Sequence, residues 1–158
     1  VVNDIYIKVN ELHNFSNLII DLRNNAGGDF DRMVRTAALF TGAIPDALQL
    51  TMPNPQRTAR VNIPAPAQKL NIPRLTILIG ERTASSAEVL AALLRRYAGA
   101  EILGTRSVGK DFLHRVIPVT HDWRLLLPAE TISIPGARLK GGVVPDGPIP
   151  PDLEKQID

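Results

Sequence analysis

The 158-residue sequence predicts an α/β fold in which a mainly parallel sheet is flanked by helices and followed by a β-rich C-terminal part. Short, almost wholly apolar runs alternate with segments whose apolar residues recur every three or four positions, as strands and helices do around a parallel sheet. From residue 112 onward the segments indicate consecutive strands. An apolar content of 44% over this length suffices for a core, so we predict a single domain over residues 1–158.

The first half of the chain begins with two strand-like runs. Residues 5–9 form the first, and residues 18–22 form the second, which is apolar enough to be buried on both faces. About eight residues join them, fewer than a parallel crossover needs, so the two strands are antiparallel, or a helix is deleted or omitted from this sequence. Glycines and asparagines at 24–28 predict a turn, and residues 29–40 predict an amphipathic helix.

Residues 52–73 contain five prolines, and we predict this region to be a surface insertion or lid with little regular structure. A third buried strand over 75–79 and an amphipathic helix over 85–97 follow, and residues 101–103 form a fourth strand. The remaining elements are the strands expected at 112–119, 123–127 and 131–134 and a Gly- and Pro-rich tail expected to be loop.

The composition argues against several classes of function. The 18 Lys and Arg residues exceed the 16 Asp and Glu residues only slightly and are scattered, which does not suggest nucleic-acid binding. The chain has no cysteine, and its three histidines lack the HExxH spacing of a zinc hydrolase, so we expect neither a metal nor a cofactor. No apolar run reaches the roughly 18 residues of a membrane span, so we expect no stable membrane insertion, and this sequence contains no signal peptide.

The first segment that suggests chemistry is the turn 24–28, which joins a buried strand to a helix. Gly27 and Gly28 allow backbone N–H groups to point into a crevice without obstruction by side chains. Such a turn suits an oxyanion hole or an anion site. A plain tight turn explains the same residues and, on spacing alone, is the more frequent case.

The second segment, residues 82–88, places Ser85 between a buried strand and the clearest helix of the chain. A serine there lies at the C-terminal edge of the sheet, where open α/β sheets bind their ligands. The helix N-terminus also favours developing negative charge. The alternative is purely structural, because Ser85 and Glu88 have the spacing of a capping box, in which the serine only satisfies a backbone N–H.

The third segment, residues 104–111, has the spacing of a Walker A nucleotide-binding motif. Asp111 stands where that motif needs Ser or Thr for magnesium, and a strand follows instead of a helix, so nucleotide binding is disfavoured. Lys110 is instead a candidate general base. A lysine accepts a proton only in its neutral form, which requires an apolar environment such as Val108 and Phe112 would supply. A solvated loop lysine is the alternative.

Taken together, these segments resemble the carboxyl-terminal processing (tail-specific) protease family. Residues 18–28, LIIDLRNNAGG, match the family's LxLDLRNNPGG, and residues 83–88, TASSAE, match its nucleophile segment TASASE. Residues 104–111, GTRSVGKD, correspond to GxxTFGKG, and residues 142–146, GVVPD, to GIxPD. The four motifs occur in the family's order, and the interval from Ser85 to Lys110 is the one typical of the family.

The resemblance implies a crotonase/ClpP-like core and a serine endopeptidase that cleaves polypeptides, with C-terminal segments among its candidate targets. It makes Ser85 the nucleophile and Lys110 its base, and no metal or cofactor is needed. The oxyanion hole would consist of the Ser86 amide and the amide of Gly27 or Gly28. Family members typically act outside the cytoplasm, in the periplasm or as secreted proteins. The PDZ module of the family is absent from this sequence, and the resemblance leaves the oligomeric state open.

Several departures from the family pattern bear on the mechanism. His114 stands where the family usually has a glutamine that orients the lysine, so His114 either takes over that role, replaces Lys110 as base, or is a simple strand residue. Arg96 stands at a position that is commonly acidic, and Ala26 replaces the proline before the glycine pair. These departures motivate the alternative that the chain is a catalytically inactive, protease-like binding module.

Overall fold

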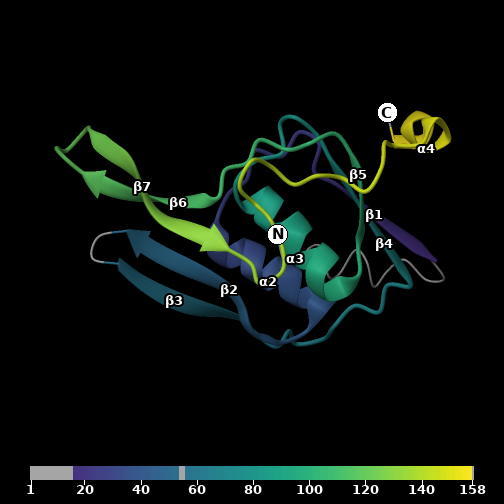
Figure 1. The fold of residues 1–158 in the computed structure, drawn as a ribbon, viewed down its shortest axis with the longest axis horizontal. Helices are drawn as coiled ribbons and strands as arrows, with labels where there is room; N and C mark the ends of the chain where they lie inside the picture. The colour runs from purple at the N-terminus through teal and green to yellow at the C-terminus, as the bar shows by residue number, and fades with distance from the viewer. Residues whose placement is uncertain (1–15, 54–55, 158) are drawn as a thin grey trace.

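The computed structural model describes residues 16–53 and 56–157, and Figure 1 shows its strands arranged in two sheets. A three-stranded parallel sheet has the order β1-β4-β5, and a four-stranded antiparallel sheet has the order β3-β2-β7-β6. The parallel sheet consists of β1 (Asn17–Asp21), β4 (Arg74–Ile79) and β5 (Glu101–Gly104); the antiparallel sheet consists of β2 (Ile44–Pro53), β3 (Gln56–Ile63), β6 (Phe112–Pro118) and β7 (Arg124–Ser133). The α/β class and its parallel sheet are confirmed, whereas a mainly parallel sheet is wrong for the described residues.

The two long helices, α2 (Phe30–Thr41) and α3 (Ser86–Ala98), lie between these sheets (Figure 1). Asp29 caps the start of α2 by accepting the Arg32 N–H at 2.8 Å, and Gly99 ends α3 in the left-handed conformation. Buried residues of both helices and both sheets form one core cluster; examples are Ile77, Leu93, Ile102, Leu48 and Ile132. The helices therefore join the two sheets into one folded unit.

The Pro-rich region differs from our expectation. Residues 44–53 and 56–63 form the antiparallel β2–β3 pair, and 64–73 are the part without helix or strand. Apolar and polar side chains alternate over residues 59–63, and several side chains of the segment are β-branched, which favours a strand. Pro53 is the last residue of β2, and Pro64 directly follows β3. Proline lacks the N–H that a ladder needs, so here it marks strand ends.

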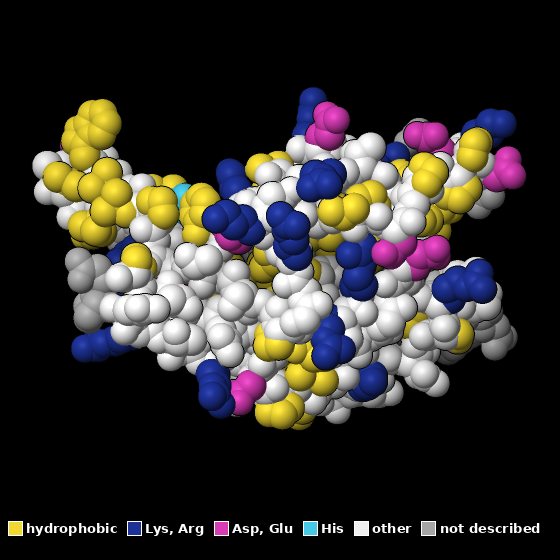
Figure 2. Space-filling view, in the orientation of Figure 1, with side chains coloured by type: hydrophobic (Ala, Val, Ile, Leu, Met, Phe, Trp, Pro, Cys, Tyr) yellow, Lys and Arg dark blue, Asp and Glu magenta, His cyan; other side chains and the backbone are white. Residues whose placement is uncertain are grey.

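The C-terminal part also contains two differences from the sequence prediction. The strands expected at 123–127 and 131–134 are largely one long strand, β7, whose hairpin with β6 projects from the body of the molecule (Figure 1). Figure 2 shows hydrophobic side chains gathered at the projecting end. The tail expected to be loop ends in helix α4 (Pro151–Ile157), where a proline occupies the favoured first helical position.

The two remaining expectations are the first predicted strand and the absence of a membrane-spanning segment. The strand predicted at residues 5–9 lies outside the described residues. Within the described part, the helices are too short or too polar to cross a membrane.

Candidate active site

Three turns meet where the parallel strands β1, β4 and β5 end. Because the strands are parallel, their carboxyl ends lie at one edge of the sheet, and the segments that follow them are brought together there. The Ala84 N–H donates to Asn25 O at 3.0 Å, which joins the second turn to the first. The Val108 N–H donates to Thr83 O at 3.0 Å, which joins the third turn to the second. The three segments singled out in the sequence are therefore neighbours in space.

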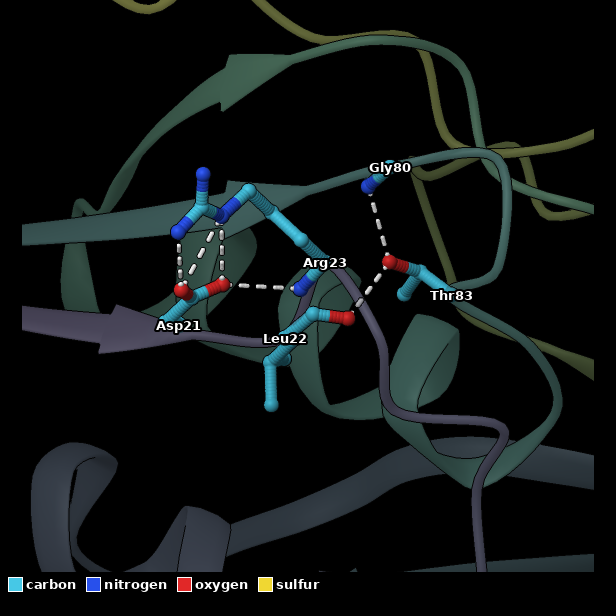
Figure 3. A network of polar contacts seen from close by, with 5 residues as sticks. All are labelled: Asp21, Leu22, Arg23, Gly80 and Thr83. Carbon is cyan, nitrogen blue, oxygen red and sulfur yellow. Dashed lines mark hydrogen bonds and ion pairs between the residues drawn. The ribbon is translucent and has the colours of Figure 1, made fainter. Parts of the chain in front are cut away.

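Thr83 anchors the turn that carries Ser85, as Figure 3 shows. Its side chain is fully buried, its hydroxyl donates to Leu22 O at 2.7 Å, and it accepts the Gly80 N–H at 2.9 Å. One hydroxyl thus connects the end of β1 to the end of β4. Beside it, the Arg23 guanidinium donates to both carboxylate oxygens of Asp21, and these hydrogen bonds hold the pKa of Asp21 below its ordinary value.

Ser85 occupies an unusual backbone conformation, with φ 56° and ψ −129°. An ordinary N-cap residue has an extended backbone at negative φ and uses its side chain to cap the helix. Ser85 departs from this backbone conformation, and the Glu88 N–H is taken by the Ser85 carbonyl at 2.9 Å. A non-glycine residue at positive φ costs on the order of 1–3 kcal/mol and is characteristic of functional sites. The geometry thus resembles the strained strand-to-helix turn that presents a nucleophile.

The Glu88 carboxylate holds the Ser85 turn against the Lys110 loop. It is 1% exposed, and it accepts four hydrogen bonds. Oε2 accepts the backbone N–H groups of Ser85 and Lys110, each at 2.8 Å. Oε1 accepts the Gly109 N–H at 2.6 Å and the Ser107 hydroxyl at 2.5 Å. Because the nitrogens of Ser85 and Lys110 lie at the same distance from one oxygen, they are separated by at most twice that distance.

A fourth segment is tied to the same carboxylate through Ser107. The Ser107 hydroxyl accepts the Val143 N–H at 2.8 Å while it donates to Glu88. The backbone N–H of Ser107 donates to Val143 O at 3.3 Å. The GVVPD segment at 142–146 is therefore connected to the nucleophile turn through two side chains, both of them buried.

The side chains of Lys110 and His114 lie outside this buried network. Lys110 is exposed, and its amine has no hydrogen-bond or ionic partner within the described part of the chain. Val108, expected to shield it, is 48% exposed, while Phe112 is half-buried. His114 is exposed on β6, where its ring makes an edge contact with Phe112 at 5.1 Å between centroids.

The amides expected to form an oxyanion hole lie beside Ser85. A Cβ built on Gly27 would lie 2.9 Å from the Ser85 Cβ, so only glycine fits at this φ of +99°. The Gly27 N–H donates to Asn25 Oδ1 at 2.9 Å, and the Gly28 N–H donates to the Ser86 hydroxyl at 2.6 Å. The Ser86 N–H has no partner among residues 16–53 and 56–157.

Sequence reasoning assigned no functional role to the two side chains that connect these segments, Glu88 and Ser107. Glu88 was visible only as the second half of a capping box, and its bond to the Ser85 N–H is what that motif predicts. Its bonds to Gly109, Lys110 and Ser107 cross to another loop, and no local spacing indicates them.

The sequence is similar to a known protein family and to individual members of it. Residues 2–149 match the family model of peptidase family S41. The "Probable CtpA-like serine protease" of Staphylococcus epidermidis is 28% identical over 99 residues, which are 63% of this chain and 20% of that protein. The chain thus spans about a fifth of the length of the curated relatives it matches.

Solved structures share the fold. The photosystem II D1 C-terminal processing protease has a TM-score of 0.71 at 23% identity, over 93% of this chain and 37% of that chain. A lipoprotein from Streptococcus agalactiae has a TM-score of 0.77 at 18% identity, over 98% of this chain and 57% of that chain. At these identities the likeness is one of fold.

Proposed function

The chain belongs to peptidase family S41, and on this premise we propose that it is the peptidase core of a serine endopeptidase with a Ser85/Lys110 dyad. Family membership confirms the resemblance to carboxyl-terminal processing proteases. The observation that carries the proposal is the Glu88 carboxylate, whose Oε2 accepts the backbone N–H groups of both Ser85 and Lys110 at 2.8 Å. Helix capping alone requires only the first of these bonds.

The proposed reaction begins when the neutral Lys110 amine accepts the proton of the Ser85 hydroxyl as its oxygen attacks a peptide carbonyl. The N–C bond of the tetrahedral intermediate then breaks, and the protonated lysine donates to the leaving amine. Water next attacks the acyl-enzyme as Lys110 accepts its proton. The ester bond to the Ser85 oxygen then breaks, and the protonated lysine returns the proton to that oxygen, which leaves a carboxylic acid product and the free serine. This sequence requires no metal or cofactor.

The exposure of Lys110 makes substrate binding part of the mechanism. A lysine accepts a proton only in its neutral form, which removal of water from around the amine favours. A polypeptide lying over Ser85 would cover the Lys110 loop and remove that water. We therefore propose that the base becomes active in the enzyme–substrate complex, and that His114, which is also exposed, contributes to orienting the lysine there.

The oxyanion hole is proposed to use the Ser86 N–H, which is unpaired within the described part of the chain, together with Gly27 or Gly28. Both glycine N–H groups already donate within the protein, to Asn25 and to Ser86. At least one must turn toward the substrate, because a lost oxyanion donor costs about 2.7–4 kcal/mol of transition-state stabilisation. These internal bonds also favour the second candidate function, a protease-like binding module without activity.

Cleavage of an unfolded protein such as casein distinguishes the two candidates. Ser85→Ala and Lys110→Ala should each abolish fragment formation, while Ser133→Ala and Lys155→Ala, at exposed positions, should cleave like the wild type. Activity that survives Lys110→Ala but disappears in His114→Ala would assign the base to the histidine. A wild-type protein that binds casein without cutting it would support the binding module.

Three further features of the proposal rest on the family. They are a crotonase/ClpP-like core within residues 1–158, a preference for sites near substrate C-termini, and a location outside the cytoplasm. The preference is testable with two fluorogenic peptides that place the same cleavable bond near the C-terminus or in the middle. Equal kcat/KM for both peptides would reject a C-terminal preference.

A further inference from the structure

A cavity of about 350 Å³ lies beside the last turns of α3, outside the proposed catalytic machinery. Its walls are the C-terminal half of α3 and the chain segment 136–144. Three arginines line it, Arg95, Arg96 and Arg138, and none of the lining residues is acidic. Figure 2 shows Lys and Arg side chains gathered over this part of the molecule. The volume is within the range of small-ligand sites.

Each of these arginines is held in place by a backbone carbonyl. Arg95 donates to Val144 O at 2.6 Å, Arg96 Nε to Pro135 O at 3.2 Å, and Arg138 Nε to Lys140 O at 3.2 Å. The Arg96 guanidinium also lies over the Tyr97 ring, 5.4 Å from its centroid. The planar groups are therefore oriented before any ligand arrives, which lowers the entropic cost of binding.

The positive charge of the cavity is only partly compensated. Asp146 pairs with Arg95 at 3.2 Å, whereas Arg96 and Arg138 have no acidic partner within residues 16–53 and 56–157. The Arg95 Nε is buried and has no hydrogen-bond partner in that same part of the chain. That nitrogen is closed off from solvent, so it does not face the cavity, and the groups available to a ligand are the guanidinium groups of Arg96 and Arg138.

Helix electrostatics explain only part of this arrangement. Arg95 and Arg96 are in the last turn of α3, where cations complement the negative end of the helix dipole. Arg138 belongs to a different segment and brings a third guanidinium to the same cavity.

We infer that this cavity binds a small oxyanion, a phosphate or a carboxylate, between the guanidinium groups of Arg96 and Arg138. Guanidinium groups bind both anions through paired N–H···O bonds, which lysine cannot reproduce. The cavity wall is also connected to the catalytic loops, because Val143 lines it and donates to Ser107 Oγ. A bound anion would therefore brace the segment that supports Glu88.

Calorimetric titration of the purified protein with inorganic phosphate in chloride buffer tests the inference directly. Arg138→Gln and Arg96→Gln should each weaken phosphate binding by about tenfold or more. Arg60→Gln is the matched control, because Arg60 is an exposed arginine paired with Asp46 elsewhere on the surface. Arg138→Lys retains the charge but not the paired donors, so its affinity should lie between those of the wild type and Arg138→Gln.

A pair of peptides that differ only in a C-terminal carboxylate or amide identifies the source of the anion. Tighter binding of the acid than of the amide, abolished by Arg138→Gln, would assign a peptide carboxylate, and binding of phosphate alone would assign a free anion. Binding should also slow amide exchange across 136–144. The inference is wrong if neither probe binds at millimolar concentration, or if Arg60→Gln weakens binding as much as Arg138→Gln. These are binding measurements, so their outcome is independent of proteolytic activity.

Discussion

Replacing Glu88 by glutamine tests whether one carboxylate holds the two halves of the proposed dyad together. A carboxylate only accepts hydrogen bonds, and both of its oxygens receive two donors here. Glutamine keeps the shape but substitutes an amino group for one oxygen. Whichever way the amide is turned, its N–H₂ faces at least one backbone N–H, either those of Ser85 and Lys110 or that of Gly109.

The expected loss follows from the number and burial of these bonds. A hydrogen bond to a charged group contributes about 1.5–3 kcal/mol, and a buried donor left unpaired costs about 1–3 kcal/mol. Glu88 is 1% exposed, so solvent cannot replace the lost partner. We therefore expect Glu88→Gln to reduce the free energy of unfolding by about 3 kcal/mol or more, which for this chain length lowers Tm by about 6–12 °C.

Activity should fall as well, because the Lys110 loop is no longer held against the Ser85 turn. A displacement of about 1 Å at a catalytic group costs on the order of 100-fold in rate, so kcat/KM for a peptide substrate should fall by about that factor well below the new Tm. Urea titration and initial rates measure the two effects, with Glu101→Gln, at an exposed position, as the control. The reasoning fails if Glu88→Gln changes the unfolding free energy no more than Glu101→Gln does.

Three other substitutions test neighbouring parts of the site. Gly27→Ala should lower both Tm and casein cleavage, because its Cβ would lie 2.9 Å from that of Ser85 at a strained φ; an unchanged Tm would contradict the described turn. Ser86→Ala removes the acceptor of the Gly28 N–H, so kcat/KM should rise by about two- to tenfold, and a fall would show that the hydroxyl supports the turn. The lowered pKa of Asp21 stabilises the fold above the unfolded-state value, about 3.9, and this contribution disappears as the pH falls through the folded-state value. Asp21→Asn should therefore lower the free energy of unfolding by less than about 1 kcal/mol near pH 7, since the side chain is 42% exposed. In a urea titration repeated over a series of pH values, the difference between wild type and variant should vanish at the acid end. A difference that stays constant with pH would refute the linkage.

Local patterns in the sequence predicted the parts of the fold that depend on neighbouring residues. The apolar run at 75–79 and the helical periodicity at 85–97 correspond to β4 and α3 within one residue at each end. The Pro-rich region is the main difference, because its five prolines predict little regular structure between them. In the structure the two prolines at 53 and 64 end the strands β2 and β3, and residues 56–63 pair along their length.

The order and spacing of the motifs determined, without coordinates, the family and the pair of residues proposed to act. Only the tertiary structure showed that the Glu88 carboxylate accepts the N–H of Lys110 and that the Gly28 N–H donates to Ser86, 58 positions away in the chain. It also showed that arginines from separate segments line the cavity beside the last turns of α3. The physical reason is the range of each interaction. Periodicity and capping reflect contacts within a few residues, whereas hydrogen bonds between loops depend on how the strands that carry them are placed side by side.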